Sequence, residues 1–141
     1  MTVHERGESF YNDMIPPLIK GLEEKGVIDE DAGCKVVKLK GFKTPMIAVK
    51  SDGGFNYDST DIAAIHHRLF DVKASRLVYI TDSGQEYHFK QLFAAADKAG
   101  WLEHKPRLDH MNFGLVLGKD GSKIKSRSGE TPKLMDLLDE A

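Results

Sequence analysis

Two residues four positions apart, Tyr57 and Asp61, offer the clearest ligand chemistry in this 141-residue chain. If the segment around them is helical, they lie on one face, one turn apart. A carboxylate beside a phenol can bind a planar cation: Asp61 would pair with a guanidinium or ammonium group while Tyr57 supplies a hydroxyl or a ring face. The alternative is structural, with Asp61 or Ser59 capping the helix and Tyr57 packing. The spacing alone favours that alternative.

Gln85 is a second candidate because it follows an apolar run at residues 76–81. That run is typical of a buried parallel strand. In open α/β sheets, ligands bind outside the carboxyl ends of the strands, where a primary amide could accept a hydrogen bond from a polar ligand. An exposed glutamine at the start of a helix is the simpler interpretation without further context.

Residues 119–133 form a third candidate, a glycine-interleaved stretch with a local net charge of +3. A flexible cationic loop of this kind suits phosphate oxygens. It does not contain the Walker A pattern, and charge runs are usually solvated surface, so that alternative stays open. Its basic residues are Lys119, Lys123, Lys125, Arg127 and Lys133.

Other chemistries lack support in the sequence. The chain contains no G-x-G-x-x-G, H-E-x-x-H, C-x-x-C or G-x-S-x-G pattern. His66 and His67 are adjacent and should point to different faces of a helix, so we expect no metal site. Cys34 lies in an apolar run and is expected to be buried and unreactive.

Hydrophobic spacing predicts the elements that would position these residues. Apolar residues recur at helical spacing over residues 15–22, and Pro16 and Pro17 place the start of that helix, which should end near Gly26. The further expected elements are a hairpin of strands 34–40 and 45–50, a helix over 59–70, a strand over 76–81, a helix over 85–98 stopped by Gly100, a strand over 111–117 and a final helix from residue 131.

From residue 59 onward, helices alternate with short apolar strands, which favours an α/β layered fold with a mostly parallel sheet. A length of 141 residues supports one core, and no tract resembles a linker between domains. The final expected helix reaches Ala141 without a stop signal. We therefore expect the chain to be a piece of a longer protein.

The composition is that of an ordinary soluble globular protein, with 40% hydrophobic and 30% charged residues. The 20 Lys and Arg residues oppose 22 Asp and Glu, for a net charge of −2, whereas a protein that binds nucleic acid over its whole surface is usually far more basic. No segment approaches the roughly 18 apolar residues of a membrane span. A single cysteine and the lack of an apolar signal region favour a reducing, intracellular compartment.

Read in order, several stretches resemble arginyl-tRNA synthetase, a class I aminoacyl-tRNA synthetase. The run D-G-G-F-N-Y-D-S-T-D-I-A-A over residues 52–64 is highly specific to that family. The matching stretches, which span almost the whole chain, are Glu5–Tyr11, Lys50–Ala64, Gln85–Phe89, His110–Gly118 and Arg127–Thr131.

The resemblance implies a partial Rossmann-type catalytic domain, with a parallel sheet flanked by helices and a small N-terminal hairpin region. It also implies a two-step reaction, in which arginine attacks the α-phosphate of ATP, with Mg²⁺ as cofactor, and the arginyl group then passes to tRNA(Arg). Tyr57 and Asp61 match the family's Y-x-x-x-D, which binds the substrate guanidinium, and Gln85 matches the glutamine that helps to hold the arginine. A planar cation with five donors needs such a fork of oxygens.

The same resemblance assigns residues to ATP. The basic stretch lies where class I enzymes carry the KMSKS loop, and Ser126 stands in the place of its second lysine. The candidates for neutralising the phosphates are Lys123, Lys125 and Arg127. The residues expected beside the adenosine, with backbone contacts favoured over side-chain contacts, are His110, Phe113 and Gly114. No tightly bound cofactor is expected in the chain itself.

The HIGH motif of class I enzymes does not occur in these residues, and in the family it lies upstream of them. The resemblance therefore implies the second half of a catalytic domain, with residues 1–50 as a helix and hairpin and residues 51–141 as the Rossmann half. We expect the isolated chain to be inactive and its partners to be the missing parts of the synthetase, in a cytoplasmic parent or, alternatively, an organellar one. The alternative function is a non-catalytic module that binds arginine, ATP or an acidic partner.

Overall fold

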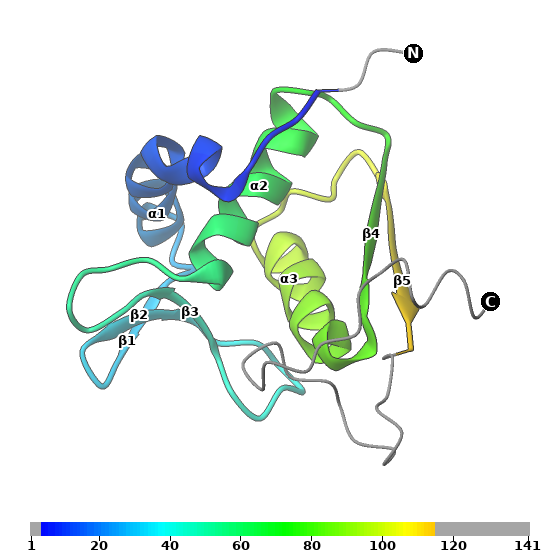
Figure 1. Ribbon diagram of the computed structural model, residues 1–141. Helices are drawn as coiled ribbons and strands as arrows, with labels where there is room; N and C mark the ends of the chain where they lie inside the picture. Colours follow the sequence, from blue (N-terminus) through cyan, green and yellow to red (C-terminus); the bar gives the residue numbers. More distant parts are fainter. Residues whose placement is uncertain (1–3, 115–141) are drawn as a thin grey trace, which may run out of the picture.

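The computed structural model describes residues 4–114, in which helices alternate with short strands (Figure 1). This order confirms the α/β class expected from the sequence. The elements are η1 (Glu8–Met14), α1 (Ile15–Glu24), β1 (Asp29–Asp31), β2 (Cys34–Val37), β3 (Met46–Val49), α2 (Tyr57–Phe70), β4 (Arg76–Asp82), η2 (Ser83–Gln85), α3 (Glu86–Lys98) and β5 (Arg107–Phe113).

The first α-helix begins where its prolines require. Pro16 and Pro17 occupy the first turn of α1, where a missing N–H costs no hydrogen bond. The helix ends at Glu24, and Gly26 follows with a φ of +70°, a left-handed conformation that glycine adopts without strain. Both predicted ends of this helix are confirmed. The short helix η1 precedes it, in a segment for which the sequence predicts no element.

The predicted hairpin is confirmed as the antiparallel pair β2 and β3. A third strand, β1, pairs with β2 and completes a sheet of order β1-β2-β3. The sequence does not predict β1, because its residues Asp29-Glu30-Asp31 are acidic, exposed and without apolar alternation. Cys34 at the start of β2 is only half-buried, so the expectation of a buried thiol is wrong.

The second sheet is a parallel pair, β4 and β5, connected through α3 (Figure 1). Their register runs from Arg76 opposite Arg107 to Asp82 opposite Phe113. The predicted start of the last strand, residue 111, is wrong by four positions. Its first residues are polar and escape a search for apolar runs, although Asp109 is paired with Arg76 on the neighbouring strand at 2.7 Å.

Only one face of β4 is buried, which corrects the expectation of a strand covered on both faces. Leu77 and Tyr79 are 7% and 8% exposed, whereas Val78 and Ile80 on the opposite face are 43% and 67% exposed. The buried residues pack with α3, as the contact between the rings of Tyr79 and Phe89 shows. The exposed side of this strand therefore contributes little to the core.

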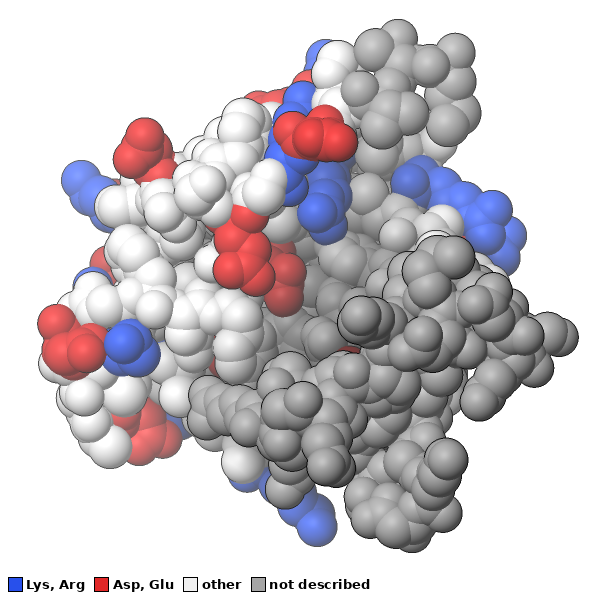
Figure 2. Space-filling model, in the orientation of Figure 1, with Lys and Arg blue, Asp and Glu red and all other residues white. Residues whose placement is uncertain are grey.

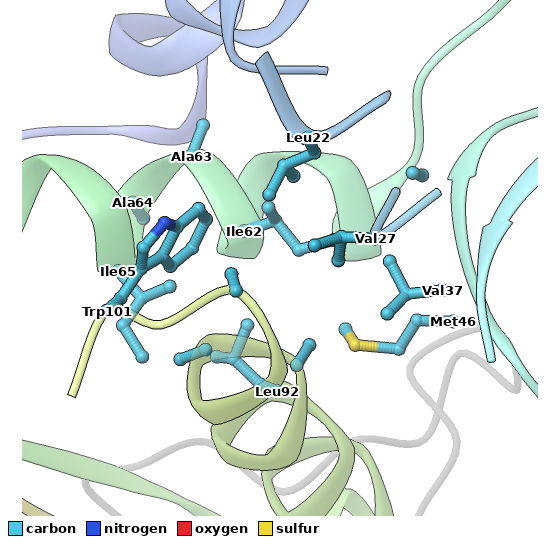
Figure 3. Packing of buried hydrophobic residues seen from close by; sticks show 14 of the residues in the cluster. Leu22, Val27, Val37, Met46, Ile62, Ala63, Ala64, Ile65, Leu92 and Trp101 are labelled. Atoms are coloured by element: carbon cyan, nitrogen blue, oxygen red, sulfur yellow. The ribbon is translucent and has the colours of Figure 1, made fainter. Parts of the chain in front are cut away.

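The hydrophobic core lies where α1, α2, α3 and the small sheet meet (Figure 3). Ile62 and Ile65 of α2 point toward Leu92 of α3, and Met46 of β3 approaches from the other side. Ile65, Leu92 and Met46 are completely buried. This packing fixes the angle between α2 and α3, the two helices that carry the candidate ligand residues.

On the surface, acidic and basic side chains are interspersed over the described part of the face shown in Figure 2. This distribution is in line with the nearly balanced net charge of −2. Within residues 4–114, no helix is long and apolar enough to cross a membrane.

Candidate functional site

The site begins at the first turn of α2, which is capped by Asn56. The Asn56 side chain accepts a hydrogen bond from the Ser59 backbone N–H at 3.2 Å, and the Ser59 hydroxyl accepts one from the Asn56 backbone N–H at 3.1 Å. This reciprocal capping box starts the helix at Tyr57, two residues before the predicted start. The N-cap is therefore Asn56 rather than Ser59 or Asp61: Ser59 takes part in the capping box from the third helical position, whereas the Asp61 carboxylate takes no part in it.

Tyr57 and Asp61 both lie in α2, one helical turn apart, as predicted. Tyr57 is 61% exposed, so it does not pack in the core as the structural alternative supposes. Nearby Asp58 above all, with burial and Asp61, raises the pKa of the Tyr57 hydroxyl. The phenol therefore remains protonated at neutral pH and can donate a hydrogen bond.

His88 of α3 connects to this first turn of α2 through both of its ring nitrogens. Nε2 lies 2.7 Å from Oδ2 of Asp61, and Nδ1 lies 3.1 Å from Oδ1 of Asp58. Burial alone would lower the pKa of His88, but the hydrogen bonds and charges of the two carboxylates outweigh it and raise this pKa to about 9. The imidazole is therefore a cation at neutral pH, with an N–H directed at each carboxylate.

Asp58 also forms a hydrogen bond to the antiparallel sheet, at strand β3. Its Oδ2 accepts a hydrogen bond from the Ile47 backbone N–H at 2.9 Å, and the neighbouring Ser59 hydroxyl donates to the Ala48 carbonyl at 2.7 Å. One end of α2 is thereby held against β3 while its carboxylates face α3. The short segment from Tyr57 to Asp61 thus serves both the fold and the site.

Gln85 lies just beyond the carboxyl end of β4, in η2 and at the N-cap of α3, as predicted. Its side chain is exposed, and its Nε2 donates to Oδ2 of Asp82 at 3.3 Å. No hydrogen bond joins Gln85 to Tyr57 or Asp61 within the described residues. The connection runs through α3, because His88 follows Gln85 by three residues and contacts Asp61 directly.

Of the three residues predicted to lie beside the adenosine, His110 lies in the middle of β5, Phe113 ends the strand and Gly114 follows it. The His110 ring is occupied within the fold, at 2.8 Å from the Thr81 hydroxyl and stacked on Phe89 with ring centroids 4.6 Å apart. Phe113 is 54% exposed opposite Asp82 at the carboxyl edge of the parallel pair, and Gly114 follows it. This edge also carries Gln85, and it is where open α/β sheets bind ligands.

The remaining predicted residues, Lys123, Lys125 and Arg127, lie outside the described part of the chain. Within residues 4–114, no group of three or more His, Cys, Asp or Glu side chains is arranged to hold a metal ion.

The comparisons with known proteins connect this geometry to a family. The family model for the catalytic domain of class I tRNA synthetases specific for arginine matches residues 1–141. The chain belongs to the class I arginyl-tRNA synthetase family. The matching relatives include the arginine–tRNA ligase of Protochlamydia amoebophila, 51% identical over 141 residues, and the cytoplasmic arginine–tRNA ligase of Arabidopsis thaliana, 50% identical over 143 residues.

The arginyl-tRNA synthetase relatives are much longer than this chain. The alignments cover 95% and 99% of the chain but only 24% of either relative, so the chain spans about a quarter of their length. The crystal structure of arginyl-tRNA synthetase from Plasmodium falciparum matches with a TM-score of 0.80 and 31% identity, over 99% of this chain and 22% of that one. These matches confirm the expected fold, which is part of a Rossmann-like class I synthetase catalytic domain. They do not favour the non-catalytic alternative.

Sequence reasoning missed two residues of the candidate site, Asp58 and His88. Both lie inside stretches that carry the family resemblance, but neither was assigned a role. One signal in the sequence could have pointed to His88: it follows Gln85 by three residues, and positions three apart share one face of a helix. The contact of His88 with two carboxylates of α2 was not available, because it depends on how α3 packs against α2.

Proposed function

We propose that the protein containing this chain is an arginine–tRNA ligase, which activates arginine with ATP and transfers it to tRNA(Arg), and that this chain supplies the guanidinium subsite. The observation that carries the proposal is the state of the Asp61 carboxylate. Its Oδ2 is held by His88 at 2.7 Å, its side chain is 30% exposed, and Oδ1 accepts no hydrogen bond from the described residues. An ionised, oriented and accessible carboxylate suits a guanidinium ligand.

In the proposed complex, Asp61 accepts N–H bonds from the planar guanidinium, and Tyr57 offers its hydroxyl or ring face beside it. Gln85 contributes an amide at the same edge of the fold. Lysine presents a compact ammonium that cannot fill a planar fork, and a neutral analogue leaves the Asp61 charge unpaired. The subsite therefore selects arginine by both geometry and charge.

The ATP half of the proposal depends on other residues. His110, Phe113 and Gly114 would lie beside the adenosine, and because the His110 ring is engaged by Thr81 and Phe89, we propose backbone contacts there. Lys123, Lys125 and Arg127 would neutralise the phosphates in a degenerate KMSKS loop. We assign no Mg²⁺ ligand among the described residues, and no step is derived through the ion.

Partners and location follow from the same proposal. The partners are L-arginine, ATP, tRNA(Arg) and the rest of the synthetase, to which we propose this chain contributes the second half of the catalytic domain. Relatives are named both as cytoplasmic and as chloroplastic/mitochondrial arginine–tRNA ligases in Arabidopsis thaliana. We propose a cytoplasmic location.

The test is arginine-dependent exchange of pyrophosphate into ATP, measured with tRNA(Arg) present, by the full-length product of the reading frame that encodes this chain. We expect exchange with arginine and none with citrulline, whose urea group carries no charge. The substitution Asp61→Asn should raise the KM for arginine by at least tenfold, whereas Asp97→Asn, at an exposed position near the end of α3, should leave it unchanged. Absence of arginine-dependent exchange would overturn the proposed activity.

A further inference from the structure

His88 forms contacts that the proposed guanidinium subsite does not yet explain. Together with Asp58 and Asp61 it makes what we call the carboxylate clamp, in which one imidazolium bridges two carboxylates at 3.1 and 2.7 Å. The side chains of His88 and Asp58 are each 11% exposed, so the clamp is largely shielded from water. Of the three side chains, only that of Asp61, which is 30% exposed, remains accessible to a ligand.

The clamp restricts the one torsion on which a carboxylate fork depends. The terminal torsion of an aspartate is broad, so a solvated Asp61 carboxylate could turn its plane freely. His88 holds Oδ2 from one side, and the imidazole is itself fixed at its other nitrogen by Asp58. Asp58 is anchored by the Ile47 backbone N–H at 2.9 Å. The chain of contacts therefore runs from the backbone of β3 to the plane of the Asp61 carboxylate.

Tyr57 belongs to the same assembly. Its ring lies edge-on to the His88 ring, with centroids 5.0 Å apart and planes at 69°. The imidazole thus contacts both side chains of the Y-x-x-x-D pair. No other described residue touches both of them in this way through hydrogen bonds or ring contacts.

We propose that His88 is a positioning residue that sets the plane of the Asp61 carboxylate and thereby makes the subsite prefer a guanidinium over an ammonium ion. This inference rests on the proposed function, because it assumes that Asp61 receives the guanidinium. His88 itself touches no substrate. Its role is to hold one carboxylate oxygen so that the remaining lone pairs form a fork.

A purely electrostatic role for His88 makes the opposite prediction. The two carboxylates and the imidazolium carry a net charge of about −1, and removal of the imidazolium leaves about −2. If charge alone mattered, a neutral residue at position 88 would strengthen the binding of every cation, arginine and lysine alike. If geometry matters, arginine binding weakens while lysine binding does not, because an ammonium ion needs no oriented fork.

The experiment uses the full-length product described above and compares His88→Gln with the double variant Asp58→Asn/His88→Gln. The double variant restores the net charge of the clamp to about −1 without the imidazolium. His67→Gln is the matched control, since His67 also pairs with an aspartate, Asp71, which is the C-cap at the other end of α2 and lies at 2.7 Å. Three quantities are measured by pyrophosphate exchange: the KM for arginine, kcat, and the inhibition constant of L-lysine.

We expect His88→Gln and the double variant to raise the KM for arginine about tenfold, the lower end of the effect of residues that orient a ligating group. Because this loss is one of binding, kcat should change less than twofold. The inhibition constant of lysine should stay the same or fall, so the preference for arginine declines, and the control should match the wild type in all three quantities.

Three results would each overturn a different part of this picture. An unchanged or lower KM for arginine in His88→Gln, with the wild type active, would refute the positioning role and leave the proposed function intact. An equal loss of arginine and lysine affinity would assign His88 a general structural role and refute the inference. No arginine-dependent exchange by the wild type would refute the proposed function itself.

Discussion

His88 keeps its charge because two neighbouring carboxylates overcome the cost of its burial. The pKa of this imidazole rises from 6.5 to about 9, so it holds a proton at neutral pH that an unfolded chain would release. A histidine in this state is a fixed cation rather than a switch in the physiological range. Protonation gives the imidazole a second N–H, so that it can donate to Asp58 and Asp61 at once, whereas a neutral imidazole has only one donor.

This raised pKa predicts a pH dependence of stability. Below about pH 6.5 the imidazole is protonated in both folded and unfolded states, and its full stabilisation is present. Between pH 6.5 and 9 only the folded state holds the proton, so the free energy of unfolding falls as the pH rises, by on the order of 2 kcal/mol with allowance for partial screening.

Urea unfolding of the 141-residue chain at pH 6.5, 8 and 9.5 measures this change. The difference in stability between the wild type and His88→Gln should shrink steadily over that range. A difference that stays constant with pH would mean that the folded-state imidazole is not a cation.

The elements around the site depend on a few side chains at helix ends. The capping box of Asn56 and Ser59 decides where α2 begins, and the hydroxyl of Ser59 also reaches the Ala48 carbonyl in β3. The same turn therefore starts the helix, docks the hairpin and presents Tyr57 to solvent. A change in the cap should affect all three.

Replacement of Asn56 with alanine should lower the free energy of unfolding by about 1 kcal/mol, since alanine leaves a first-turn N–H without a partner. Thermal unfolding of the 141-residue chain measures the loss. Ser83→Ala, at an exposed position in η2, serves as the control and should leave the melting temperature unchanged. Equal effects of the two substitutions would contradict the capping role.

The two faces of β4 should respond differently to truncation. Leu77 is 7% exposed, and Leu77→Ala should destabilise the chain by about 2–5 kcal/mol through lost burial and a new cavity. Ile80 is 67% exposed, and Ile80→Ala should change stability by no more than about 0.5 kcal/mol. Chemical denaturation of both variants checks the contrast, and a large loss for Ile80→Ala would mean that its face is covered in solution.

In the molecule as a whole, the described residues supply the proposed arginine-binding part of the active site. The proposed guanidinium subsite is carried by α2 and α3, whereas the HIGH motif of class I enzymes does not occur among the 141 residues. Activation of arginine needs both, because ATP must be gripped and aligned with the substrate carboxylate. The chain also spans only about a quarter of its relatives, 24% in the case of the Arabidopsis cytoplasmic protein.

We therefore predict that the isolated 141-residue chain shows no detectable arginine-dependent pyrophosphate exchange. Calorimetric titration with arginine and with ATP adds a second measurement, in which part of a site should bind either ligand weakly or not at all. Tight binding of one ligand without turnover would instead favour a non-catalytic binding module. Turnover by the chain alone would refute the need for residues outside it.

Much of the fold could be predicted from local patterns. Proline and glycine placed both ends of α1, and helical spacing predicted α2 and α3 to within two residues. Among the strands, the failures were β1 and the start of β5, where charged residues pair across strands and leave no apolar signal. Strand pairing depends on a distant partner, and a local pattern contains no information about it.

The order of the residues is enough to predict the family and to place Tyr57 and Asp61 on one helical face, because motifs and periodicity can be read along the chain. The use of Asn56 as the cap, the exposure of one face of β4 and the bridge from His88 to Asp58 and Asp61 are seen only in the folded chain. The last of these joins residues 27 and 30 positions apart. Such a contact exists only after burial of the core has fixed the angle between α2 and α3, and no spacing along the chain encodes that angle.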